Sequence, residues 1–137
     1  MKVLSEVAES DVTIVYVCII KDRNHDASFL SGNELYEYAL NELLKKALEN
    51  APCNDVNVIV DDSRFIRIDD LRKNVIGLSK ETRRNVKKVE KASSNKCVRI
   101  ADYVAGSIFA KYERNDDEYY KEIEEKISIA CESLRPR

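Results

Sequence analysis

Two runs of β-branched residues constrain the fold of this 137-residue chain more than any other feature. Residues 12–20 read Val-Thr-Ile-Val-Tyr-Val-Cys-Ile-Ile, and residues 56–60 read Val-Asn-Val-Ile-Val. Nearly continuous runs of this kind are typical of strands buried on both faces in a sheet that helices cover. We therefore expect both runs to form strands, with the first at the centre of the sheet.

Helical patterns alternate with these strands. A short helix is expected before Asp11. The segment 31–34, Ser-Gly-Asn-Glu, has the spacing of a capping box, in which the serine and the glutamate satisfy the first free amides of a helix. That helix should end before Pro52, because proline cannot continue the hydrogen-bond ladder. Its inward-facing residues are predicted to be Leu35, Tyr38, Ala39, Leu43, Ala47 and Leu48.

The middle of the chain predicts a short helix over residues 69–78 and a short edge strand over 86–89. Lys87 and Lys88 would discourage further pairing of that edge. A second amphipathic helix should follow, because one apolar stripe recurs at 100° per residue. The stripe consists of Ala101, Val104, Ala105, Ile108, Phe109 and Tyr112.

The segment 115–118, Asn-Asp-Asp-Glu, is another capping box and predicts a final helix that reaches residue 134. The inward-facing residues of this helix are expected to be Tyr119, Tyr120, Ile123, Ile127, Ala130, Cys131 and Leu134. Strands alternating with helices predict an α/β fold with about three strands and a helical C-terminus. The length predicts a single domain spanning residues 1–137.

Cysteine spacing and hydropathy indicate the compartment. Cys18, Cys53, Cys97 and Cys131 lie far apart and form no CxxC pair, so we expect reduced thiols buried in the core. The longest apolar run, near residues 12–20, is too short to cross a bilayer, and no signal-peptide pattern opens the chain. A cytoplasmic protein without a membrane partner is expected.

Three aspartates form the strongest candidate for chemistry. Asp61 and Asp62 follow the strand at 56–60, and Asp102 lies at the flank of the second amphipathic helix, one turn before Gly106. Clustered carboxylates suit Mg²⁺ or Mn²⁺, which prefer hard oxygen ligands. Two such ions could activate water for phosphodiester hydrolysis if a carboxylate bridged them. In the simpler alternatives, Asp61 or Asp62 caps the following loop and Asp102 pairs with Arg99.

A basic stretch is the second candidate. Between residues 80 and 99 there are eight lysines and arginines but two glutamates, an excess that can neutralise phosphates of a nucleic acid. The residues chosen for such contacts are Arg83, Arg84, Lys87 and Lys88. No aromatic residue interleaves with them, so base stacking is not expected. The alternative is an edge strand with a solvated charged face.

Other catalytic patterns are missing from the sequence. Gly32, Gly77 and Gly106 are isolated and do not follow a strand as a phosphate-binding loop requires, which argues against nucleotide-dependent kinases and dehydrogenases. His25 has no serine or cysteine nucleophile motif nearby.

The run from Cys97 to Tyr120, CVRIADYVAGSIFAKYERNDDEYY, resembles the domain-of-unknown-function family 3800. Members of that family end with a Gln-x-Ala-Asp helix and a Tyr-Glu-Arg step. Residues 56–61 and 16–21 resemble two strands of the same family, so the similarity covers nearly the whole chain. The resemblance implies a ribonuclease-H-like sheet covered by helices, with Asp61 and Asp102 as metal ligands of a nuclease-type site.

Two features depart from that family's pattern. Arg99 stands where the family has glutamine, which places a cation beside the expected site. No Asp-Glu-Ser-Gly strand precedes Val12. The resemblance therefore implies an N-terminally truncated or split member with little activity alone, in which either an upstream-encoded partner chain fills the gap or the sheet has rearranged. The alternative is a non-catalytic protein that binds nucleic acid or forms a homodimer.

Overall fold

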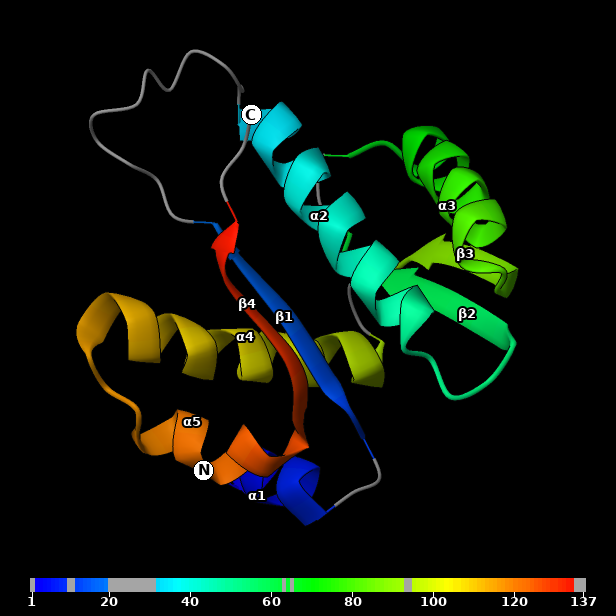
Figure 1. Ribbon diagram of the computed structural model, residues 1–137. Helices are drawn as coiled ribbons and strands as arrows, with labels where there is room; N and C mark the ends of the chain where they lie inside the picture. Colours follow the sequence, from blue (N-terminus) through cyan, green and yellow to red (C-terminus); the bar gives the residue numbers. More distant parts are fainter. Residues whose placement is uncertain are drawn as a thin grey trace. The chain divides into compact units, whose positions relative to one another are not determined.

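The computed structural model describes residues 2–9, 12–19, 32–62, 64, 66–92 and 95–134, which form a mixed α/β structure (Figure 1). The predicted α/β class is therefore confirmed. Its elements in chain order are α1 (Lys2–Glu9), β1 (Ile14–Ile19), α2 (Gly32–Glu49), β2 (Asp55–Val60), α3 (Ile68–Thr82), β3 (Asn85–Lys91), α4 (Lys96–Arg114), α5 (Glu118–Ile123), the 3₁₀ turn η2 (Glu124–Lys126) and β4 (Ile127–Leu134).

The chain divides into two compact units. The first unit comprises residues 1–14 and 92–128, and the second comprises residues 15–91 and 129–137. β1 pairs with β4, and β2 pairs with β3, so the described strands form two sheets of two strands each. The expectation that β1 is a central strand was wrong, because β4 is its one hydrogen-bonded neighbour among the described strands.

A βαβ unit organises the second unit. β2 and β3 are parallel, with Asp55 opposite Asn85 and Val60 opposite Lys91, and α3 forms the crossover that parallel strands require. The predicted strand at 56–60, the helix at 69–78 and the strand at 86–89 are thus confirmed, each slightly longer than expected. α3 and α2 contribute to one core with the sheet, whose buried residues are Leu44, Val58, Val60, Ile66, Leu71 and Val75.

A β-bulge sets which side of β3 faces this core. The register pairs Val56 with Val86 but the next residue, Asn57, with Lys88, so Lys87 is an extra residue on β3. Side chains of a regular strand alternate between faces, and residues 86 and 89 would then point in opposite directions. Because the bulge shifts the alternation by one, Val86 and Val89 both pack against the core.

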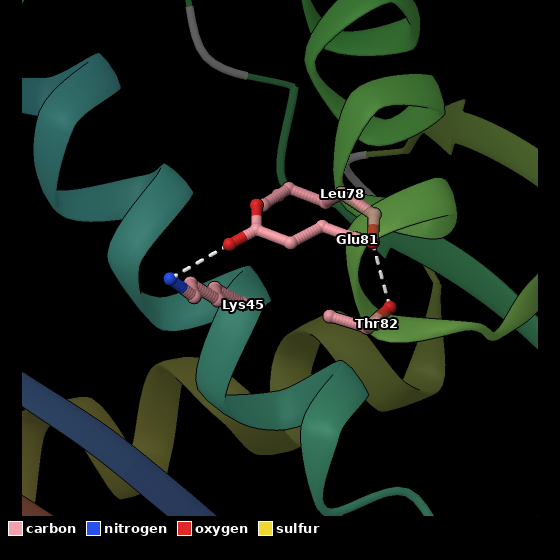
Figure 2. Close-up of polar contacts among 4 residues, drawn as sticks. All are labelled: Lys45, Leu78, Glu81 and Thr82. Carbon is pink, nitrogen blue, oxygen red and sulfur yellow. Dashed lines mark hydrogen bonds and ion pairs between the residues drawn. The ribbon is translucent and has the colours of Figure 1, made fainter.

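An ion pair joins α2 to α3 at the surface, where Lys45 Nζ lies 2.9 Å from Glu81 Oε1 (Figure 2). Beside it, within α3, Thr82 Oγ1 donates to the Leu78 carbonyl at 2.7 Å. The hydrogen bond and negative charge of Glu81 raise the pKa of Lys45, but both side chains are exposed, so the pair stabilises the fold little.

The predicted apolar stripe of α2 was only partly right. Leu48 is buried, four of its other members are half-buried and Ala47 is exposed. Leu44, which the stripe omitted, is buried in the core. The capping-box serine, Ser31, lies outside the described residues.

Arg84 ties the end of α2 to the start of β3. Its Nε donates to the Leu48 carbonyl at 2.8 Å, and its two terminal nitrogens donate to Asn54 Oδ1 at 3.1 Å and to the Glu49 carbonyl at 3.3 Å. The last carbonyls of a helix lack partners within the helix, and a guanidinium can satisfy several of them at once. Arg84 is therefore part of the framework of the second unit.

The first unit contains α1, α4, α5 and η2, with α1 packed against α4 and α5. The side chain of Asn95 caps α4 by accepting from the amides of Cys97 and Val98 at 2.8 and 3.4 Å. Lys111 Nζ lies 3.7 Å from the centre of the Tyr120 ring and so links α4 to α5.

The predicted stripe of α4 was partly wrong. Val104 and Ile108 are buried as expected, but Ala101, Ala105, Phe109 and Tyr112 are exposed. The helix buries Val98, Ser107 and Ala110 in their place, so its packed face is rotated relative to the prediction.

The predicted C-terminal helix was wrong beyond Ile123. Asn115 does not start that helix but ends α4 in the left-handed conformation, with φ of 53°. α5 is one short helix, and residues 127–134 form β4, which pairs with β1. Ile127 and Ile129 are β-branched and alternate with other residues, which suits a strand once a pairing partner is present.

The expectation of buried cysteines was wrong for Cys18, Cys53 and Cys97, and the side chain of Cys131 lies outside the described part. Cys53 and Cys97 are exposed and Cys18 is half-buried, all three as free thiols. Cys53 lies in the segment after α2, and Cys97 lies in the first turn of α4. Both positions are exposed to solvent. None of the helices in the described part of the chain has the length and apolar character that crossing a membrane requires.

Replacing Arg84 by alanine should lower the free energy of unfolding by about 2 kcal/mol, because three hydrogen bonds to a charged donor are lost. Urea unfolding followed by circular dichroism measures the change. Lys80→Ala, on the exposed surface of α3, is the control and should change stability by less than about 0.5 kcal/mol. Equal midpoints for the two variants would contradict the framework role of Arg84.

Candidate functional site

The two aspartates after β2 lie at the carboxyl end of the parallel sheet. Both side chains are exposed. Because Val60 is paired with Lys91, the end of β3 lies beside them. Lys91 Nζ is 3.6 Å from Asp62 Oδ1 and donates to the Ile66 carbonyl at 2.7 Å. The site therefore already contains a cation, which the sequence-based prediction did not include.

Lys91 makes Asp61 and Asp62 chemically different. Its side chain is only 15% exposed, and it connects Asp62 to the loop that leads into α3. A divalent ion at Asp62 would be repelled by the ammonium group. Asp61 has no hydrogen bond or ion pair with any described residue, so its carboxylate remains open to a ligand from solution. Neither aspartate caps the loop through a hydrogen bond within the described part.

Asp102 lies on α4, in the other unit, and its side chain is exposed. Arg99 is also exposed, and no ion pair joins the two within the described residues, so the alternative of a local pair has no support. A Cβ added at Gly106 would meet no atom within 4 Å, which leaves the surface one turn after Asp102 open. The structure brings Asp61 and Asp62 together; it defines no distance from either to Asp102.

The expected metal ligands form an incomplete set within either unit. Mg²⁺ and Mn²⁺ favour about six oxygen ligands, and the end of β2 supplies two carboxylates, one of them engaged by Lys91. Among the residues that the structure describes, no group of three or more His, Cys, Asp or Glu side chains could hold a metal ion. Asp61 and Asp62 therefore cannot hold the ion without ligands from elsewhere.

The four basic candidates separate into two kinds. Arg84 is occupied by α2 carbonyls, and Lys88 Nζ lies 3.3 Å from Glu90 Oε2. The side chains of Arg83 and Lys87 are exposed and have no hydrogen bond or ion pair with described residues. Only these two remain fully available for phosphates.

The basic residues and the carboxylates lie toward opposite ends of the sheet. Arg83 precedes β3, whereas Asp61 follows β2, and the strands run parallel. A strand of six residues is roughly 20 Å long. One phosphodiester group therefore cannot contact both, but a nucleic acid strand of several nucleotides could span them.

Comparison with known proteins adds no relative: the chain matches no protein-family model, no curated protein and no solved structure. Membership of family 3800 and a ribonuclease-H-like sheet stay predictions from the sequence.

The sequence did not predict the position of Lys91, because only the register of β2 against β3 shows that residue 91 lies beside residues 61 and 62.

Replacing Lys91 by methionine should lower the free energy of unfolding by about 1–2 kcal/mol, because the Ile66 carbonyl loses a charged donor. Lys87→Met serves as the matched control, since Lys87 is exposed and has no such partner. Denaturant unfolding of both variants measures the difference. A Lys91 variant as stable as the control would show that this contact does not hold the loop.

Proposed function

We propose that this chain is the carboxylate-bearing part of a metal-dependent, nuclease-like protein related to family 3800, with little activity by itself. The observation that carries the proposal is the exposed, unengaged Asp61 at the carboxyl end of a parallel strand. Open α/β sheets bind ligands outside the carboxyl ends of their strands. The resemblance of the CVRIADYVAGS run to family 3800 is the second support for a nuclease-like function.

The aspartates have unequal roles in this proposal. Asp61 is the metal ligand of the second unit, because it is exposed and its side chain has no ion-pair partner in the described part. Asp102 is the second ligand on the strength of the resemblance to family 3800 alone. Asp62 contributes less to metal binding, because the ammonium group of Lys91 lies beside its carboxylate. When bound, Mg²⁺ or Mn²⁺ would supply the acidity that activates water. The missing ligands require another carboxylate, contributed by a second chain, which accounts for the low activity expected of this chain alone.

Asp61→Asn and Asp102→Asn should each weaken Mn²⁺ binding by about tenfold, since each removes one anionic ligand. Free Mn²⁺ can be counted by electron paramagnetic resonance during titration of the full chain. Asp70→Asn is the matched control, because Asp70 is also an exposed carboxylate of the second unit but lies on α3. If all three variants bind Mn²⁺ like the parent chain, the proposed metal ligands are wrong.

The substrate class that we infer is nucleic acid, bound through Arg83 and Lys87. These are the two basic candidates that are exposed and unengaged within the described part. The alternative function, nucleic-acid binding without catalysis, uses the same two residues. The two functions differ in their products: the first predicts Mn²⁺-dependent cleavage when the completing chain is added, and the second predicts binding alone.

The double variant Arg83→Glu with Lys87→Glu should bind single-stranded RNA or duplex DNA at least tenfold more weakly at low salt, because each change replaces a phosphate-neutralising cation with an anion. The salt dependence of log K should also become shallower by about two units of slope. Fluorescence anisotropy provides both values. Arg72→Glu with Lys73→Glu, two exposed residues of α3, is the control of equal charge. No binding by the parent chain at low salt would reject nucleic acid as a partner.

A further inference from the structure

The parallel pair β2–β3 is a complete sheet in the part of the chain that the structure describes. Parallel strands occur mainly in larger sheets that are covered on both faces, and sheets of two strands are marginally stable in water. Each strand therefore keeps one edge on which backbone amides and carbonyls pair with no other described strand. Such edges bind strands of other chains unless a structural feature blocks them.

The edge of β3 is blocked. Lys87 is the extra residue of the bulge, which interrupts the regular spacing of amides along this strand. Lys88 is exposed one residue later. A bulge and edge lysines are two of the means by which natural proteins prevent strand addition.

The second edge of β2 pairs with none of the described strands, and its sequence carries no feature that blocks strand addition. Its six residues run from Asp55 to Val60 without lysine, arginine or proline, and four of them are valine or isoleucine. The extra residue at the bulge belongs to β3, so β2 itself continues without interruption. On the face away from the core, Asn57 is exposed and Ile59 is half-buried, which gives an added strand one apolar side chain to cover.

Charge selects the kind of strand that can pair there. β2 begins with Asp55 and is followed by Asp61, and both carboxylates are exposed. In a two-fold antiparallel pairing of two copies centred on Val58, Asp55 of each copy would lie opposite Asp61 of the other. Like charges directly opposite destabilise a sheet, whereas opposite charges stabilise it. The acidic ends therefore disfavour a second copy and favour a strand with basic ends.

We propose that the free edge of β2 binds an extended segment of another protein, in which β-branched residues lie between flanking lysines or arginines. Backbone pairing provides the affinity, and the flanking cations provide the selectivity by lying beside Asp55 and Asp61. This interaction needs no metal and does not rest on the proposed nuclease-like function. With one six-residue strand as the contact, binding is weak and reversible.

The probes are two peptides, Lys-Val-Thr-Val-Thr-Val-Lys and the same peptide with aspartate at both ends, titrated against the full chain with EDTA present. The lysine peptide should bind three- to tenfold more tightly, because its two ends form attractive instead of repulsive pairs. Methylation of alternate backbone nitrogens should abolish binding, since it removes the donors of the ladder. Fluorescence anisotropy measures each affinity.

Asp55→Lys should remove the preference for the lysine peptide or invert it, while leaving the proposed metal ligands intact. Glu113→Lys, an exposed change of equal charge on α4, should leave the preference unchanged. Circular dichroism confirms that both variants are folded. Any of three results would overturn the proposal. The two peptides could bind with equal affinity, binding could survive backbone methylation, or the chain could self-associate in a way that the lysine peptide does not inhibit.

Discussion

The burial of one face of a two-stranded parallel sheet holds the second unit together. Leu71 and Val75 of α3 are fully buried against Val58 and Val60 of β2, and Leu44 of α2 completes this core. Burying such side chains contributes about 1.5–3 kcal/mol each, more than any exposed ion pair of the unit. The bulge at Lys87 is required by the same constraint, because without it β3 could not direct both Val86 and Val89 toward the helices.

The framework also determines which charged residues remain available for function. Arg84 binds the carbonyls that end α2, and Lys91 binds the Ile66 carbonyl beside Asp62. Both cations lie in partly buried positions next to carbonyl groups. A buried carbonyl without a donor costs more free energy than the cation would gain by staying exposed to solvent. A count of basic residues along the sequence therefore overstates the surface available to phosphates. Arg83 and Lys87 remain because neither has a carbonyl or carboxylate to satisfy in the described part.

Sequence patterns predicted the elements that pack against neighbours close to them in the sequence. β2, α3 and β3 follow from β-branched runs and apolar spacing, because the crossover helix joins strands that are close in sequence. β4 was missed because its pairing with β1 joins the two ends of the chain, and no window around Ile127 contains that information. The position of Asp61 at a strand end was predictable. The cation beside Asp62 was not, because it depends on register.

Asp61 directly follows β2, so it lies at one end of the edge that we propose for strand binding. A segment that pairs along residues 55–60 must place one of its own ends beside Asp61, whichever direction it runs. Any ligand at Asp61 would then contact that segment as well, and the two binding events would be coupled. Coupling of this kind is reciprocal, so a bound segment would change the affinity for a cation by the same factor as the cation changes the affinity for the segment. A segment with a basic end at Asp61 would compete with a divalent ion, whereas one with a carboxylate there would add a ligand to it. The residue that meets Asp61 therefore decides whether a completed sheet excludes a metal or binds it.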